Sequence, residues 1–280
     1  MRRFGNAMKK KLTPYERVKI ARDAKRPGSD DYIDALFEDF FEIHGDRAYS
    51  DDPAVICGIA RFGNVPVSIA AICKGHTIEE RVKRNFGMAQ PDGYRKFLRC
   101  LAQAVKFHRP VITFIDTPGA YPGKSAEERG QGHAIAECLY QMSAAPIPII
   151  SIVIGEGGSG GALALAVADR LIMHENAVLS VLSPEGFASI LWKDPSRVAE
   201  ASDVMKLTAA DLLEYKIADY VIPEPDSDAS KAPELMINRT GELIRQELRE
   251  LTAISAAQLL SNRYRKYRLI GALEGSVCVG

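Results

Sequence analysis

The 280-residue sequence has no excess of charge of either sign and no long hydrophobic run. Lysine plus arginine and aspartate plus glutamate number 36 each, so the overall charge points to neither a nucleic acid nor a membrane surface as the partner. No apolar run reaches the length of a membrane-spanning helix. The first residues are charged and do not have the apolar middle of a signal peptide, so we expect a cytoplasmic protein.

Cysteine is scarce and scattered. The five cysteines are Cys57, Cys73, Cys100, Cys138 and Cys278. An odd set without a C-x-x-C pair argues against both a disulfide framework and a zinc site. We therefore expect most of these side chains to be small buried apolar groups, and we expect no metal in this chain.

Positive charge is distributed unevenly, although the total is balanced. The first eleven residues, MRRFGNAMKKK, contain five basic side chains, and the segments RVKRNFGM and NRYRKYRLIG are also basic. Runs of this kind are typical of solvated faces, but they can also dock an acidic partner or a polyphosphate. The sequence leaves this choice open.

Strands and helices alternate along the middle of the sequence. The pattern predicts strands over residues 54–62, 65–75, 110–117, 147–155, 170–182 and 220–225, and Gly63-Asn64 predicts a hairpin between the first two. It predicts helices over residues 13–24, 30–45, 91–108, 125–144, 161–169, 183–192, 195–206 and 208–219, and two more after residue 234. Such an order favours parallel βαβ geometry with right-handed crossovers.

We expect one α/β domain with helical extensions at both ends. The boundaries are an N-terminal helical segment over residues 1–50, a core over 51–225, and C-terminal helices and a tail over 226–280.

A glycine-rich stretch, GEGGSGGALALA at residues 155–166, follows a predicted buried strand and allows three interpretations. Gly157, Ser159 and Gly161 match the G-x-S-x-G elbow of serine hydrolases. That chemistry needs a later histidine on a loop. The only histidine after Ser159 is His174, which falls in the next predicted strand, so this interpretation has little support.

The second interpretation is a dinucleotide-binding fingerprint. Gly155, Gly157 and Gly160 match G-x-G-x-x-G, and Glu175 stands twenty residues after Gly155, where an acid that binds ribose is expected. Such a fingerprint normally follows the first strand of its domain, whereas this one follows at least three. The match is therefore weak.

The third interpretation is an oxyanion hole, which needs only the main chain. Glycines let a substrate approach the backbone closely, and their N–H groups at a helix start point into the site. A second loop of this kind, DTPGAYPG at residues 116–123, also follows a buried strand and precedes a helix. Both loops leave the carboxyl ends of parallel strands, which is the edge where α/β sites lie.

Four long motifs carry a resemblance over residues 12–271. They are KGHTIEERVKRNFGMAQPDGYRK, ITFIDTPGAYPGKSAEERGQG, VIGEGGSGGALALAVAD and SVLSPEGFASILWK. Together they resemble the α subunit of the bacterial acetyl-coenzyme A carboxylase carboxyltransferase. The resemblance implies the crotonase-like (ClpP/crotonase) fold, a spiral of ββα units.

The resemblance also implies a reaction and partners. The family transfers a carboxyl group from carboxybiotin, held on the biotin carboxyl carrier protein, to acetyl-coenzyme A, which gives malonyl-coenzyme A for fatty-acid synthesis. A zinc-containing β subunit is implied as the partner, together with biotin carboxylase and an α2β2 assembly. The absence of C-x-x-C fits the α subunit, which would be active only with its β partner.

Site residues follow from the same resemblance. Gly160 and Gly161 match the oxyanion pair for biotin, and Gly119, Ala120, Gly157, Gly158 and Ala162 would shape the pocket. Neither loop offers a protein base, and His133 is expected to be an ordinary helix residue. We expect a Cβ at Gly161 to crowd the ureido oxygen of biotin and to shift the donors, while leaving the core mostly untouched.

Two features depart from the family, and two other functions stay open. The family has a longer helical arm before the segment LTPYERVKIARD, and the last residues, ALEGSVCVG, match no family motif, so we expect a tail there. A non-catalytic crotonase-like scaffold that binds acyl groups or a partner is the main alternative function. An NAD-dependent dehydrogenase is the other.

Overall fold

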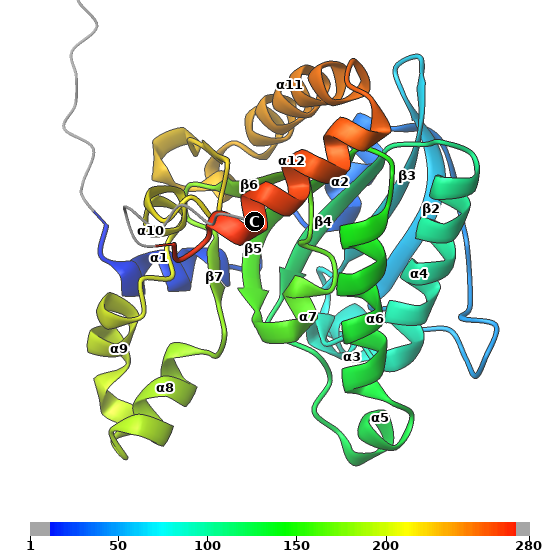
Figure 1. The fold of residues 1–280 in the computed structure, drawn as a ribbon. Helices are drawn as coiled ribbons and strands as arrows, with labels where there is room; N and C mark the ends of the chain where they lie inside the picture. The colour runs from blue at the N-terminus through cyan, green and yellow to red at the C-terminus, as the bar shows by residue number, and fades with distance from the viewer. Residues whose placement is uncertain (1–11, 273–280) are drawn as a thin grey trace, which may run out of the picture.

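One eight-stranded sheet forms the centre of the computed structural model, which describes residues 12–272 (Figure 1). Its strands run in the order β1-β2-β3-β4-β5-β6-β8, and β7 pairs with β5 outside this path. The first three strands are antiparallel and all later pairings are parallel. The strands are β1 (Glu38–Glu42), β2 (Val55–Phe62), β3 (Val65–Ile72), β4 (Val111–Thr117), β5 (Ile149–Gly158), β6 (Arg170–His174), β7 (Val178–Ser180) and β8 (Tyr220–Ile222).

Helices cover both faces of the sheet. They are α1 (Pro14–Ala21), α2 (Ser29–Leu36), α3 (Ile78–Lys83), α4 (Pro91–Lys106), α5 (Lys124–Glu128), α6 (Gln131–Ala144), α7 (Ser159–Leu163), α8 (Pro184–Leu191), α9 (Val198–Val204), α10 (Ala209–Glu214), α11 (Pro233–Thr252) and α12 (Ala256–Leu269). Four 3-10 turns lie at Asn85–Gly87, Pro195–Arg197, Pro225–Ser227 and Ala229–Lys231. In residues 12–272, no helix combines the length and the apolar character that crossing a membrane requires.

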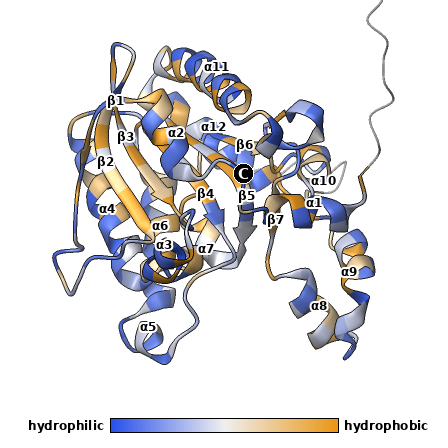
Figure 2. Ribbon diagram, turned by 180° about the vertical axis from the view of Figure 1, so that it is seen from behind, coloured by the Kyte–Doolittle hydropathy of each residue, from blue (hydrophilic) through white to orange (hydrophobic). Residues whose placement is uncertain are grey.

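Two hydrophobic cores lie on opposite faces of the sheet because strand side chains alternate. On β4, Val111 and Ile115 join the core under α4 and α6, whereas Ile112 and Phe114 join the core under α2 and α11. The inner strands are accordingly orange in Figure 2, and the outer helices are largely blue. Cys57, Cys73, Cys100 and Cys138 are buried, as predicted, and Cys278 lies outside the described residues.

The predicted hairpin is confirmed. Phe62 pairs with Val65 across Gly63-Asn64, and Gly63 has a φ of +59°. That left-handed backbone is the reason why a two-residue hairpin favours glycine here.

The predicted helix over residues 30–45 is wrong in its second half. The helix α2 ends at Leu36, and β1 then pairs antiparallel with β2. Phe37 leaves the helix in an extended conformation and packs its ring on Phe62, with 5.4 Å between ring centroids, whereas Phe41 is 71% exposed. The apolar residues therefore do not form one helical face, because pairing with the edge of β2 replaces the helix.

Several other predicted elements are shorter than expected or are divided in two. The helix over 125–144 breaks at Gly130, which has a φ of +84°, into α5 and α6. The helix over 161–169 ends at Leu163. The strand over 170–182 divides into β6 and β7, and β7 pairs with the carboxyl half of β5, which extends to Gly158.

The C-terminal helix α12 contains most of the basic run NRYRKYRLIG, in which Arg265 and Arg268 are exposed but one arginine is buried. Arg263, within the basic run NRYRKYRLIG, is 1% exposed. Its guanidinium donates to both carboxylate oxygens of Asp169 and to the carbonyl oxygens of Met142, Ala145 and Ile147, at 2.7–3.0 Å. This side chain fastens α12 to the body of the protein. The basic segment of the first eleven residues and the tail after Ala272 lie outside the described residues.

Candidate active site

The two glycine-rich loops lie against one another at the carboxyl ends of β4 and β5. Thr117 pairs with Gly157 in the last rung of the ladder between these strands. A Cβ built on Gly158 would lie 2.1 Å from the carbonyl oxygen of Pro118, so the main chains are closer than any side chain would permit. Glycine at position 158 is therefore required by this contact between the loops.

The loop after β4 is fixed from below by Thr117. Its buried hydroxyl accepts a hydrogen bond from the amide of Gly119 at 3.0 Å and donates to the carbonyl oxygen of Gly87 at 2.7 Å. Gly119 has a φ of +145°, a conformation that L side chains rarely adopt. The amide of Tyr121 donates to the carbonyl oxygen of Ala89 at 2.9 Å, which anchors the far side of the loop.

The loop after β5 opens the short helix α7. No side chain caps this helix, and the first N–H groups of any helix have no partner within it. Ser159 makes the turn from strand to helix with a φ of +53°. Gly160, the next residue, is half-buried, whereas Gly161 is buried. The helix start therefore presents main-chain donors beside the loop that follows β4.

Gly161 is the point of closest contact between the helix and the opposite loop. A Cβ on Gly161 would lie 2.5 Å from the amide nitrogen of Ala120 and 3.0 Å from the hydroxyl of Tyr94. A side chain here would therefore displace the loop after β4 and press on the hydroxyl of Tyr94. That the rest of the core stays mostly untouched remains a prediction. Gly160 differs, since its Cβ would meet only Ile135, at 3.4 Å.

All seven predicted site residues belong to this one structure. Gly157, Gly158, Gly160, Gly161 and Ala162 lie at the end of β5 and the start of α7, and Gly119 and Ala120 lie in the facing loop. Ala162 differs from the others because it is fully buried in the hydrophobic core. Its side chain supports the helix from behind.

A chain of ion pairs that was not predicted from the sequence lies next to the two glycine loops. Lys74 Nζ lies 2.8 Å from Asp116 Oδ1 and 3.0 Å from Glu156 Oε2. Glu156 also accepts from Arg22 Nε at 2.6 Å, and Arg22 contacts Glu185 at the start of α8 at 2.7 Å. A charged residue at the carboxyl end of each of three apolar strands was the available signal.

These ion pairs favour the charged forms of Lys74 and Glu156. Burial favours the neutral form of Glu156, but the nearby Lys74 and Arg22 prevail and hold its pKa below the usual value. Burial likewise opposes the charge of Lys74, but Asp116 and Glu156 raise the pKa of its ammonium. Glu156 is therefore poorly suited to accept a proton as a base.

The serine-hydrolase interpretation lacks a histidine. Burial first, and then the positive charge of Arg26, lower the pKa of His174 to about 3. The Nε2 atom of His174 lies 3.1 Å from Thr240 Oγ1, and His133 is exposed on α6. Among residues 12–272 no hydrogen bond joins Ser159 to either ring.

The dinucleotide interpretation loses its acidic residue. A carboxylate oxygen of Glu175 accepts from the backbone amide of Glu224 at 2.9 Å, and Arg17 lies 4.0 Å away. Gly155 is turned toward the protein interior, where its Cβ would lie 2.5 Å from Asp116 Oδ1. These contacts give Glu175 and Gly155 structural roles.

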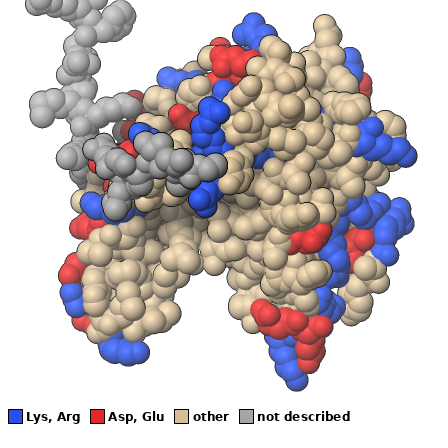
Figure 3. Space-filling view, viewed as in Figure 1, with Lys and Arg blue, Asp and Glu red and all other residues tan. Residues whose placement is uncertain are grey.

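An open hollow lies beside the loops. In Figure 3 it separates the lobe formed by α8 and α9 from the part of the body that ends in α5, and most of its visible walls are uncharged. A narrow cleft between the loops and the start of α8 is lined by Pro118, Gly157, Gly158 and Pro184, among others. The loops therefore face accessible space.

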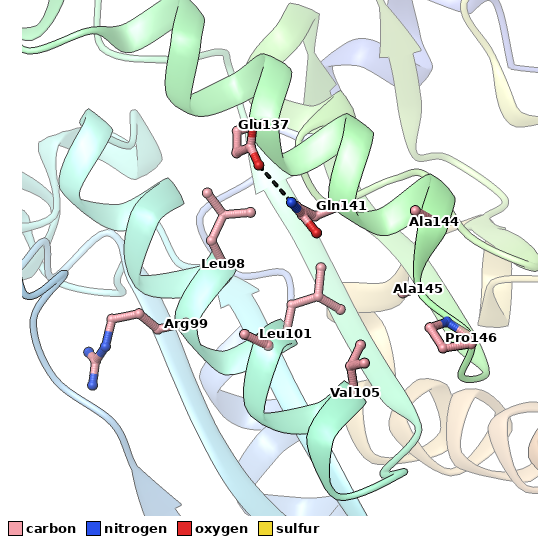
Figure 4. Close-up of a pocket in the computed structure, with 10 residues that line it drawn as sticks. Leu98, Arg99, Leu101, Val105, Glu137, Gln141, Ala144, Ala145 and Pro146 are labelled. Atoms are coloured by element: carbon pink, nitrogen blue, oxygen red, sulfur yellow. Dashed lines mark hydrogen bonds between the residues drawn. The ribbon is translucent and has the colours of Figure 1, made fainter.

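A larger groove lies elsewhere, between α4 and α6. It has a volume of about 500 Å³ and is lined by Leu98, Leu101, Val105 and their neighbours (Figure 4). Gln141 donates to Glu137 at its rim, at 2.7 Å. The groove contains no residue of either glycine loop, so it is not part of the candidate active site.

Asp30, Asp31 and His76 hold three possible metal-ligand atoms within 4.8 Å of one another. Arg84 already binds Asp30 at 3.0 Å, and the amide of Gly28 donates to Asp31 at 2.7 Å. We assign no metal to this group.

Comparison with solved structures shows the fold. A malonate decarboxylase hetero-tetramer from Pseudomonas, in complex with coenzyme A, aligns with a TM-score of 0.62 at 17% identity over 78% of this chain and 90% of that chain. The transcarboxylase 12S hexamer aligns with a TM-score of 0.61 at 20% identity over 79% of this chain and 44% of that chain. The predicted crotonase-like fold is confirmed.

Comparison of sequences shows the family as well as the fold. The acetyl-coenzyme A carboxylase carboxyl transferase subunit alpha of Clostridium botulinum (strain Alaska E43 / Type E3) is 56% identical over 262 residues, which are 94% of this chain and 96% of that protein. In Natranaerobius thermophilus a protein named as subunits beta/alpha is 53% identical over 94% of this chain, which covers 43% of that protein. A family model described as acetyl co-enzyme A carboxylase carboxyltransferase-like matches residues 1–271. The chain therefore belongs to the acetyl co-enzyme A carboxylase carboxyltransferase-like family.

Proposed function

We propose that this chain is the α subunit of an acetyl-coenzyme A carboxylase carboxyltransferase. It would transfer the carboxyl group of carboxybiotin to acetyl-coenzyme A and so form malonyl-coenzyme A. The observation that carries the proposal is the contact between the two glycine loops, which leaves main-chain donors at the start of α7 and no room for a side chain at Gly158 or Gly161. The names of the relatives support the substrate assignment.

In this proposal Gly160 and Gly161 supply the oxyanion hole. Negative charge develops on the ureido oxygen when carboxybiotin loses its carboxyl group, and donors held in place stabilise that charge. The uncapped start of α7 fits this requirement because its N–H groups have no partner within the helix. Gly119, Ala120, Gly157 and Gly158 set the shape of the pocket, and Ala162 supports it.

The chain contributes position rather than a base. Lys74 pairs with Asp116 and Glu156, and it helps to hold the pKa of Glu156 below the usual value. The two histidines nearest in sequence to the loop after β5 are His133, which is exposed on α6, and His174, which is buried on β6. We propose that the biotin nitrogen freed by the transfer takes the proton of acetyl-coenzyme A. The work of the protein is then to hold two substrates in reacting geometry.

We propose the β subunit as the partner that completes the site. Relatives in which β and α are one chain support this pairing. On the lobe beside the hollow, Ile190 and Leu191 of α8 are 61% and 62% exposed, and Val204 of α9 is 54% exposed. Exposed apolar groups of this kind are typical of protein interfaces. The biotin carboxyl carrier protein, biotin carboxylase, the α2β2 assembly and a cytoplasmic location belong to the same proposal.

The test is reconstitution. The chain alone and the chain mixed with a β subunit are assayed for malonyl-coenzyme A formation from acetyl-coenzyme A and a carboxylated carrier. We expect product only from the mixture. Binding of the β subunit without product would favour the non-catalytic scaffold, and stoichiometric zinc in the purified chain would contradict the assignment as α.

A further inference from the structure

The ladder between β4 and β5 is interrupted just before the glycine loops. Ile115 pairs with Val153 and Thr117 pairs with Gly157, so one residue of β4, Asp116, faces three residues of β5. A bulge of this kind leaves main-chain groups without ladder partners and bends the strand. Its geometry determines where Gly157 and Gly158 meet the opposite loop.

Side chains bind two main-chain groups of this bulge. The carboxylate Oδ1 of Asp116 accepts from the amide of Glu156 at 2.8 Å. The carbonyl oxygen of Ile154 accepts from Arg26, whose guanidinium is held by the buried carboxylate of Glu224 at 2.7 Å. Gly155 lies between them, where a Cβ would come within 2.5 Å of Asp116 Oδ1. The bulge is therefore held by the carboxylate of Asp116 and by the guanidinium of Arg26, which Glu224 holds in turn.

Lys74 joins the bulge to a third strand. It extends from the end of β3, and its ammonium touches both Asp116 and Glu156 at 2.8 and 3.0 Å. Gly87, whose carbonyl oxygen binds Thr117, packs against the stem of Lys74 and the carbonyl oxygen of Asp116. One ammonium thus fixes the ends of three strands under both loops.

We infer that Asp116, held by Lys74, is a positioning residue for the main-chain donors of Gly160 and Gly161. It acts by fixing the bulge of β5, and it touches no substrate. The inference rests on the proposed function for its catalytic consequence, although the bulge itself can be tested without any assay of turnover. An error of about 1 Å in a catalytic group can cost roughly a hundredfold in rate.

The experiment compares two substitutions of Asp116. Asp116→Ala removes the acceptor of the Glu156 amide, whereas Asp116→Asn keeps a side-chain oxygen at that place. In the reconstituted complex we expect Asp116→Ala to lower kcat by about a hundredfold with KM for acetyl-coenzyme A within about threefold. Asp116→Asn should keep kcat within about tenfold. Equal losses in the two variants would overturn the inference.

A second readout does not depend on activity. Amide hydrogen exchange over residues 155–162 should speed up in Asp116→Ala and in Lys74→Met, because the bulge loses its side-chain partners. Unchanged exchange in both would overturn the inference. If Asp116→Ala does not fold, Lys74→Met carries the same kcat and exchange tests.

Arg170→Met is the matched control. Arg170 binds the buried Glu247 at 2.6 Å. It lies at the amino end of β6, whereas the bulge lies toward the carboxyl ends of the parallel strands. This variant should lower the thermal midpoint while kcat and the exchange of residues 155–162 stay unchanged. A wild-type complex that makes no malonyl-coenzyme A would contradict the proposed function alone, because the exchange test would still decide the role of Asp116.

Discussion

Two clusters of charged residues, one at each end of the parallel strands, use the same ion-pair chemistry for different purposes. At the amino ends of the strands, the five hydrogen bonds of Arg263 occupy all five N–H donors of its guanidinium, and the side chain is 1% exposed. The second cluster, at the carboxyl ends of the strands, lies next to the candidate active site. Its side chains are 11–17% exposed and belong to Lys74, Asp116 and Glu156. The difference indicates that the first cluster serves stability and the second serves geometry.

The largest effect on stability is expected from a substitution of Arg263, at the amino ends of the strands. Arg263→Met leaves Asp169 buried without its cation, and breaking a buried pair in this way costs about 3–5 kcal/mol. Thermal unfolding of the variant should begin lower, by roughly 10 °C at the midpoint. Turnover per folded complex should be unchanged. An unaltered midpoint would mean that α12 is held mainly by its apolar contacts.

Gly161→Ala should have the largest effect on turnover. The added Cβ would lie 2.5 Å from the amide nitrogen of Ala120, so the two loops must separate. We expect a loss of at least about a hundredfold in kcat, as the loss of one oxyanion donor causes elsewhere. Gly132→Ala is the matched control, because a Cβ at Gly132 meets nothing within 4 Å. Near-normal turnover of Gly161→Ala would remove Gly161 from the oxyanion hole.

Gly160→Ala tests whether a side chain at the start of α7 can crowd the substrate without disturbing the packing of the two loops. Its Cβ would make only an ordinary contact with Ile135, at 3.4 Å, so the loops can stay in place. We expect the thermal midpoint to be preserved and kcat to fall by about tenfold, because the methyl group crowds the substrate at the half-buried helix start. Steady-state rates and melting curves of the same complex check both statements. A fall in the midpoint as large as that of Gly161→Ala would show that the two glycines do not differ as we describe.

The smallest effect is expected at Ser159. Its φ of +53° is costly for a residue with a Cβ, by about 1 kcal/mol, so Ser159→Gly should stabilise the protein slightly and Ser159→Ala should not. Both variants should keep kcat within about threefold, because the hydroxyl is not the nucleophile. A thousandfold loss with an intact fold would revive the nucleophile elbow.

The sequence predicted most of the sheet because buried strands and the Gly63-Asn64 turn leave local signals. It predicted both glycine loops for the same reason. It failed at Phe37–Glu42, where apolar residues match a helical period but pair with β2 instead. Pairing between distant segments leaves no trace in a short window of sequence, so tertiary contacts overrode the local pattern.

The ion pairs at the two ends of the parallel strands could not be predicted from the spacing of the residues in the sequence. Lys74, Asp116 and Glu156 come from three strands and meet only when β3, β4 and β5 lie side by side. Arg263 belongs to a run of basic residues that is typical of a solvated surface, yet it is buried against Asp169, 94 positions earlier. The chemistry of each residue was visible in the sequence, but the partner was not.

The contact between the two loops also bears on resistance to inhibitors. A compound that binds the amides at the start of α7 recognises atoms that every residue except proline carries. A substitution that moves those amides, such as a side chain at Gly158 or Gly161, drives one loop away from the other, since each Cβ would lie 2.1–2.5 Å from main-chain atoms. Escape from such a compound would therefore damage the enzyme that the compound targets.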